Sequence, residues 1–175
     1  MHLSNTLFFE SHLGWTSILV EGNPLSFQNL TKCRPNAHTF QNIISKKRTE
    51  VNFVAFDDPL WHTLSRVGRL NFNAAQDEHQ KVFRVKSRTF DEIFEEIGLR
   101  EFEFISVDVE GNEYEVLETI DFNKTIVKVV LSEGYHDLRI SDLMKYSGYD
   151  GPYYGDQDRW FYKKMYNQIL KDLSP

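Results

Sequence analysis

The stretch FISVDVEGNEYEVL, residues 104–117, decides the fold that this sequence predicts. It opens with β-branched and aromatic residues that continue to Val109, a composition typical of a buried strand. Gly111 then ends the strand, and Val116 and Leu117 continue at helical spacing. A strand that turns through a glycine into a helix is the repeating unit of open α/β sheets.

Acidic residues stand where this strand ends. Asp108 and Glu110 are two residues apart, so we expect their side chains on the same side of the strand. Ligands of open α/β sheets bind beyond the carboxyl ends of the strands, which makes these acids and Glu113 candidates for a functional site. The alternative is that Asp108 ends the strand and that Glu110 and Glu113 are solvated acids, favourable at a helix start.

The composition is that of a globular protein with one ordinary domain. The chain has 175 residues, of which 41% are hydrophobic and 26% charged. Its net charge of −6 argues against nucleic acid as a main partner. Cys33 is the only cysteine, so an intrachain disulfide and a thiolate metal cluster are excluded. No apolar stretch approaches the length of a membrane span.

The rest of the chain alternates strands and helices, which predicts a mostly parallel sheet with helices on both faces and an antiparallel edge formed by the last two strands. We expect the segment 38–56 to be a hairpin-like excursion. The segment 57–80 is too long for an ordinary connection, and is either a binding or lid segment or disordered. The expected strands are 17–21, 37–44, 51–56, 82–85, 127–131, 149–154 and 158–163, and the expected helices are 3–13, 24–33, 90–97, 137–147 and 164–173.

Several helix starts carry capping signals. Ser4 or Asn5 is a candidate cap for the first helix, and Asn23 followed by proline suits the second. Thr89 and Glu92 have the spacing of a capping box. We expect the helices to bury their apolar residues, namely Leu25, Phe27 and Leu30 in the second helix and Leu138, Ile140, Leu143 and Met144 in the helix 137–147.

Three strands end in acids: Glu21, Asp108 with Glu110, and Glu133. In one doubly wound sheet these ends would share an edge. An acid after the second strand of such folds accepts hydrogen bonds from the ribose hydroxyls of a nucleotide-like cofactor, which is the role we expect for Glu21. The alternative is an ordinary loop acid before a helix.

Other chemical signatures are weak or missing. His136 and Asp137 follow Glu133 and could supply a base or a metal ligand, but helix capping by Asp137 is the favoured interpretation. The remaining histidines form no metal-ligand pattern, and we predict no metal site. No glycine-rich dinucleotide fingerprint, phosphate-binding loop or nucleophile elbow is present.

The sequence resembles the FkbM-type methyltransferases over roughly residues 3–164. The segment SVDVEGNEYEVL (106–117) carries the most specific part of this resemblance. Further matching segments stand in the same order: SNTLFFESHLGW (4–15), ILVEGNP (18–24), FQNIIS (40–45), RTFDEIF (88–94) and GY with DRWFYKK (148–164).

The resemblance implies a Rossmann-like class I methyltransferase sheet and S-adenosylmethionine as cofactor. It implies methyl transfer to a hydroxyl oxygen of a sugar or another small molecule. Carried over by position, Glu21 binds the cofactor ribose, and Asn42 and Ile43 lie beside its adenine. Asp108, Glu110 and Glu113 match the motif at the reaction site, where Asp108 is also a candidate cofactor contact. They would orient the acceptor hydroxyl or assist its deprotonation.

The family pattern begins with a strand and a glycine-rich loop that precede SNTLFFE, and here Met1 stands near that place. We therefore expect residues 1–175 to form a single methyltransferase-like domain without its first, central strand, with 164–175 as a C-terminal helix or tail. We also expect this chain alone to be neither a stable monomer nor an active enzyme. The alternative function is a non-catalytic FkbM-like interaction module. The default expectation for the location is cytoplasmic, and the oligomeric state is left open.

Overall fold

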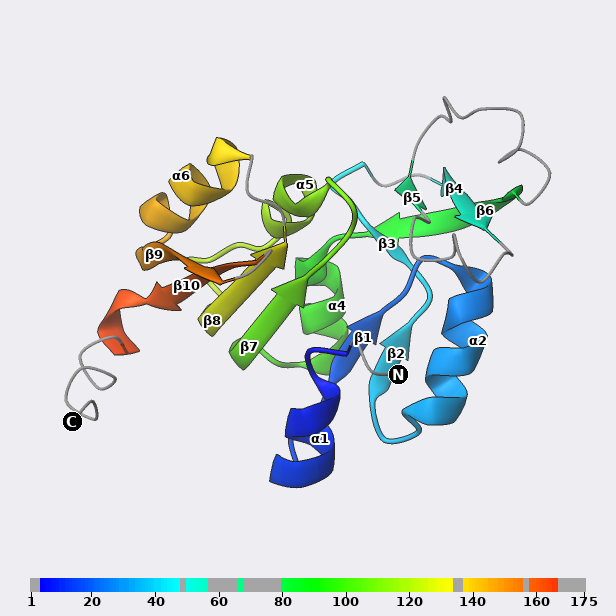
Figure 1. The fold of residues 1–175 in the computed structure, drawn as a ribbon, viewed down its shortest axis with the longest axis horizontal. Coiled ribbons are helices and arrows are strands. Elements are labelled where there is room, and N and C mark those ends of the chain that lie inside the picture. Colours follow the sequence, from blue (N-terminus) through cyan, green and yellow to red (C-terminus); the bar gives the residue numbers. More distant parts are fainter. Residues whose placement is uncertain are drawn as a thin grey trace. The chain divides into compact units, whose positions relative to one another are not determined.

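The computed structural model describes residues 4–47, 50–56, 66–67, 80–133, 137–155 and 158–166. The chain divides into two compact units, Met1–Arg88 and Thr89–Pro175, each with its own sheets (Figure 1). The single domain expected from the sequence stays a prediction. None of the helices in the described ranges has the length and apolar surface that a membrane crossing needs.

The first unit begins with helix α1 (Leu7–Leu13) and a strand–helix–strand segment, β1 (Ile18–Val20), α2 (Pro24–Cys33) and β2 (His38–Phe40). Strands β1 and β2 pair in parallel. Gly14 ends α1 in the left-handed conformation, with φ of 69°. Asn23 caps α2, because its Oδ1 accepts the N–H of Leu25 at 3.0 Å.

A buried arginine ties these elements together. Arg34 is 4% exposed and donates to the Glu10 carboxylate at 2.6 and 3.0 Å. It also donates to the hydroxyls of Ser4, Thr6 and Ser17. The hydrogen bond from Arg34 holds the pKa of Glu10 below its ordinary value. This network fixes α1 against the start of β1 and the end of α2.

The second sheet of the first unit has the order β3-β6-β4-β5. Strand β3 pairs in parallel with β6, and β4 pairs antiparallel with β6 and β5. A cluster of buried residues, Ile43, Phe53 and Val85, forms its core. The strands are β3 (Ile43–Ile44), β4 (Glu50–Phe56), β5 (Arg66–Val67) and β6 (Gln80–Arg88).

The turn between β1 and α2 packs directly on this core. A Cβ atom at Gly22 would lie 3.1 Å from the Phe53 ring and 3.2 Å from Ile43. The glycine therefore permits a close approach that a side chain would disturb.

The second unit contains one sheet of order β7-β8-β10-β9, in which β7 and β8 are parallel and β10 runs antiparallel to β8 and β9 (Figure 1). Helices α5 and α6 contact each other, and α6 contacts β9. Its strands are β7 (Glu101–Val107), β8 (Ile126–Glu133), β9 (Tyr149–Gly155) and β10 (Asp158–Lys163), and its helices are α4 (Phe90–Ile97), α5 (Glu113–Leu117) and α6 (Leu138–Tyr146).

Helices and sheet of the second unit enclose an apolar core. The Tyr149 hydroxyl donates to the carbonyl of Val127 at 2.7 Å inside it. Burial raises the pKa of this hydroxyl, so it stays a neutral donor. Members of the core with at most 3% exposure include Ile93, Phe94, Val107, Leu117, Val127, Val130, Leu131, Ile140, Met144 and Phe161.

Locally signalled features agree with the sequence. The cap at Asn23, the capping box of Thr89 with Glu92 and the cap at Asp137 are all present. The antiparallel pairing of the last strand with its neighbours is confirmed. Strands β1 and β7 belong to different sheets, and the expectation that the chain lacks a central strand between them stays a prediction.

Several predictions about pairing and length are wrong. The segment 37–44 is not one strand but two, β2 and β3, in different sheets, and neither forms a hairpin with β4. The described strands fall into separate sheets rather than one, and β4 adds antiparallel pairings with β5 and β6 that the sequence did not predict. The first helix begins only at Leu7, and its cap position, Thr6, makes no side-chain capping bond.

Some helix residues expected in the core are exposed. Leu25 is 38% exposed and Leu138 76%, whereas Ile140 and Met144 are completely buried. Helix α2 has no fully buried residue. Of the segment 57–80, only Arg66–Val67 and Gln80 lie within the described residues, and of the tail only 164–166, which are helical.

Candidate functional site

Strands β7 and β8 end side by side. They pair in parallel, with Val107 opposite Ser132. The next residues in this register are Asp108, directly after β7, and Glu133, the last residue of β8. Asp108 and Glu133 are therefore neighbours at the carboxyl ends of two adjacent parallel strands.

Asp108, Glu110 and Glu133 form what we call the carboxylate cluster, in which one oxygen from each residue lies within 4.8 Å of the others. Asp108 and Glu110 are exposed, and Glu133 is half-buried. Hydrogen bonding with Asp108, burial, and the charges of Asp108, Glu110 and Glu113 together raise the pKa of Glu133 to about 7. Glu133 therefore changes its protonation state near neutral pH.

The loop that carries Asp108 and Glu110 has an unusual backbone. Glu110 has φ of 54° and Gly111 has φ of 99°. The left-handed conformation is uncommon for a residue with a side chain and costs about 1 kcal/mol. Glu113, the first residue of α5, holds this loop: its Oε1 accepts the N–H of Gly111 at 2.9 Å and that of Val109 at 3.2 Å.

Asp108 and Glu110 lie close together, as expected, but the expected reason, alternation along a strand, is wrong. Strand β7 ends at Val107, so strand alternation does not align them. The left-handed turn at Glu110 does so. Glu113 is 6% exposed rather than a solvated acid, and its Oε1 is engaged by the backbone.

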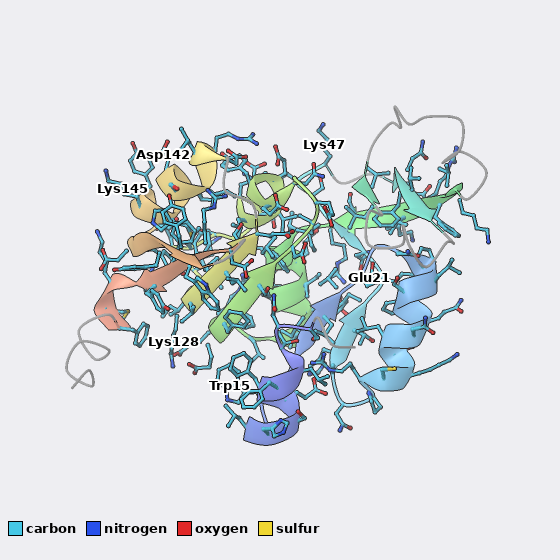
Figure 2. The ribbon with its side chains drawn as sticks, viewed as in Figure 1. Trp15, Glu21, Lys47, Lys128, Asp142 and Lys145 are labelled. Carbon is cyan, nitrogen blue, oxygen red and sulfur yellow. The ribbon has the colours of Figure 1, made fainter. Side chains whose placement is uncertain are left out.

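Glu21 lies in the first unit, between β1 and the start of α2 (Figure 2). Its N–H donates to the carbonyl of Phe40, and its Oε1 accepts the N–H of Asn23 at 2.7 Å. Burial raises the pKa of Glu21, against the opposing effect of backbone hydrogen bonds from Asn23 and Gly22. A carboxylate has about four acceptor positions, so this side chain keeps capacity for further donors.

A family model, described as the methyltransferase FkbM domain, matches residues 2–151. The chain belongs to the FkbM methyltransferase family. The match covers β1 with Glu21 and the whole carboxylate cluster, and it indicates a methyltransferase. Methyltransferases of the FkbM family generally depend on S-adenosylmethionine. No curated protein and no solved structure matches the chain.

The two remaining cofactor candidates of this FkbM chain are placed differently. The Asn42 side-chain amide donates to the carbonyl of Lys86 at 3.1 Å, which ties it to β6. Ile43 is 8% exposed and packs in the core with Phe53 and Val85. Its side chain is thus part of the wall of the first unit, and an adenine contact at this segment stays a prediction.

Asp137 is a helix cap in this FkbM chain, as expected. Its Oδ1 accepts the N–H of Arg139 at 3.0 Å, and its carboxylate also pairs with the Arg139 side chain. Hydrogen bonding from Arg139 keeps the pKa of Asp137 low. His136 lies outside the described residues.

Sequence reasoning noted Glu133 only as a strand-end acid and passed over Arg159. The parallel register of β7 and β8 is the signal that pairs Glu133 with Asp108. Arg159, in β10, is 1% exposed and donates to the Asp137 carbonyl at 2.9 Å. Burial lowers its pKa, and the charges of Asp137 and Glu113 oppose that shift, which places a positive charge near these acids.

The cluster's oxygens are close enough to share one cation, and carboxylates are ligands that Mg²⁺ and Ca²⁺ accept. Exposed acids gather without an ion as well, and no other feature of the described residues points to a metal. We assign none.

The tetrapeptide VEGN occurs twice, at 20–23 and at 109–112. In the first copy Asn23 caps its helix and Glu21 and Gly22 have ordinary negative φ. In the second copy Asn112 makes no capping bond, and Glu110 is left-handed. Identical residues thus build two different turns.

Proposed function

We propose that this chain is an S-adenosylmethionine-dependent O-methyltransferase that acts on a hydroxyl of a sugar or another small molecule. The carboxylate cluster is the observation that carries the proposal. An oxygen nucleophile must lose its proton as it accepts a methyl group, and a base with a pKa near 7 suits that task at neutral pH. Asp108 and Glu133 supply such a pair at the carboxyl ends of β7 and β8.

The proposed roles follow from the geometry. Glu133, whose pKa is about 7, takes the proton from the acceptor hydroxyl, and Asp108 holds Glu133 in place by hydrogen bonding with it. Glu110, exposed on the left-handed turn, orients further hydroxyls of the acceptor by accepting their hydrogen bonds. Three neighbouring carboxylates can accept hydrogen bonds from several hydroxyls at once, which favours a polyhydroxylated acceptor over an isolated alcohol.

Glu21 fits the cofactor site that the family implies. Its carboxylate is oriented by the Asn23 N–H and retains acceptor positions for two vicinal ribose hydroxyls. S-adenosylmethionine, when bound, supplies a methyl group on a positively charged sulfur. For the fold, we propose the class I methyltransferase arrangement, in which β1 and β7 each take a further strand on the side without a described neighbour.

Cofactor binding by the full chain is the first test. Calorimetry with S-adenosylmethionine should show binding, and Glu21→Ala should weaken it by about tenfold or more through the loss of charge-assisted hydrogen bonds. Glu95→Ala, which removes an exposed acid from α4, is the matched control and should leave affinity unchanged. Absence of binding by a folded chain would reject the proposal for residues 1–175, and it would agree with the expectation that this chain alone is inactive or with the non-catalytic module.

Methyl transfer is the second measurement. With methyl-labelled S-adenosylmethionine and a panel of free sugars, Asp108→Asn should lower the rate of methyl transfer by about tenfold or more, since Glu133 loses the carboxylate that raises its pKa. Cofactor affinity should change less than about twofold. An unchanged rate in Asp108→Asn would remove the cluster from the chemistry.

A further inference from the structure

We propose that Glu113 is a positioning residue: its carboxylate folds the 108–111 loop through two backbone hydrogen bonds and so brings Asp108 and Glu110 against Glu133. The inference rests on the proposed function for its catalytic meaning, but its geometry stands independently. It replaces the direct catalytic role that the sequence motif suggests for Glu113.

The first argument is engagement. Oε1 of Glu113 accepts the N–H groups of Gly111 and Val109, which flank Glu110 on both sides. Two backbone hydrogen bonds to one side-chain oxygen, one on each side of Glu110, offset the cost of the left-handed conformation of Glu110.

The second argument is access. Glu113 is 6% exposed, whereas Asp108 and Glu110 are exposed and Glu133 is half-buried. A substrate hydroxyl reaches the last three far more easily than Glu113. Glu113 also lies near the buried side chain of Arg159, where it opposes the lowering of the Arg159 pKa by burial. Its environment is therefore that of a buried group engaged by the backbone rather than of a group that meets substrate.

The third argument is sequence distance. Glu113 is the first residue of α5, and Glu110 belongs to the loop just before that helix. The bonds to Gly111 and Val109 therefore couple the helix start to the turn that aims Glu110. Without them the N–H groups of Val109 and Gly111 lose their Glu113 acceptor, and the left-handed turn loses this support.

Two conservative variants separate reach from charge. Glu113→Gln keeps a carbonyl oxygen at the same distance from the backbone and removes the charge. Glu113→Asp keeps the charge and shortens the side chain by about 1.5 Å, which carries the oxygen out of hydrogen-bonding distance of Gly111. Both variants retain a polar residue at the helix start, so loss of folding is not the expected outcome.

The readout is the titration of Glu133 in the full chain, followed by NMR of ¹³C-labelled carboxyl groups and assigned with Glu133→Gln. Glu133 serves as a probe because it senses the distance to the loop acids. The acids that influence it or lie across the sheet from it are Asp108 and Glu110 of the loop, Glu113 of α5 and Asp158 of β10.

The wild-type midpoint should lie near 7. Glu113→Gln should stay within about half a unit of it, and Glu113→Asp should fall by more than about one unit as the loop acids move away. Amide exchange at Val109 and Gly111 should quicken only in Glu113→Asp. A stabilising role confined to the fold would change exchange without moving the midpoint.

Three results would overturn the proposal. A larger shift of the Glu133 midpoint in Glu113→Gln than in Glu113→Asp would mean that Glu113 acts by its charge. An unmoved midpoint in Glu113→Asp would mean that the carboxylate cluster forms without Glu113, and a wild-type midpoint near 4.5 would mean that the cluster does not assemble. Calorimetry with S-adenosylmethionine tests the proposed function separately, so either idea can fail alone.

Discussion

Replacing Glu133 by glutamine should stabilise the protein, and only at a pH where Glu133 is ionised. The raised pKa of Glu133 means that the folded protein binds a proton more tightly than the unfolded chain does. Its ionisation therefore opposes folding: the penalty appears as the pH rises through the ordinary value of 4.5 and is complete above about 7. Glu133→Gln removes the penalty and keeps the size and hydrogen bonding of the side chain.

The magnitude follows from the shift. A rise from 4.5 to about 7 corresponds to at most about 3 kcal/mol at high pH. Glu133 is half-buried and its neighbours are exposed, so solvent screening reduces this ceiling to about 1–2 kcal/mol. The gain for Glu133→Gln should thus be about 1–2 kcal/mol at about pH 8 and within about half a kcal/mol of zero at pH 4.5.

Urea unfolding at both pH values, followed by tryptophan fluorescence, measures this difference. Trp160 lies opposite Leu131 of β8 and reports on the second unit. Asp137→Asn is a control of opposite sign, because Arg139 lowers the pKa of Asp137 and stabilises its charge. Asparagine caps helices as well as aspartate does, so this variant should lose, not gain, stability above the ordinary pKa. An equal gain for Glu133→Gln at both pH values would refute the electrostatic reasoning.

Two further substitutions test the packing. Gly151→Ala should destabilise the protein by about 3 kcal/mol or more, because φ is 128° and the new Cβ would lie 2.7 Å from the carbonyl oxygen of Trp160. Gly14→Ala, with open space around its Cβ, should cost only about 1 kcal/mol; equal losses of stability in thermal unfolding would contradict the clash. Arg34→Ala should destabilise the protein by about 2–4 kcal/mol near neutral pH, because it removes the ion pair with Glu10. The loss should be smaller in acid, where Glu10 is protonated and no longer stabilised by the arginine. Urea unfolding at both pH values measures the difference, and a loss independent of pH would exclude the ion pair as its source.

Features encoded within four residues were predictable from the sequence. The capping box of Thr89 with Glu92 and the caps at Asn23 and Asp137 depend on a side chain and a backbone N–H two or three residues away. No distant residue has to be known. The acids at strand ends were found by the same kind of local reasoning, and Asp108 does contribute to a cluster.

Features decided by distant partners were not predictable. Whether β2 and β3 form one strand depends on β1 and β6, which lie before and after them in the chain. Leu138 and Ile140 are both apolar, but only Ile140 is buried, because residues two apart in a helix lie on nearly opposite sides and the packing partners decide which side is covered. The burial of a charged residue such as Glu113 runs against composition and follows only from the loop it holds.

The two VEGN segments show where conformational information in such a motif is stored. The four shared residues do not determine the backbone conformation, since the first copy has ordinary negative φ angles and the second passes through the left-handed region at Glu110. The fifth residue differs: Pro24 has no N–H and no side-chain acceptor to offer the turn, whereas Glu113 Oε1 accepts the N–H groups of Gly111 and Val109. A motif search or a loop graft limited to the four residues VEGN therefore transfers the sequence without the conformation.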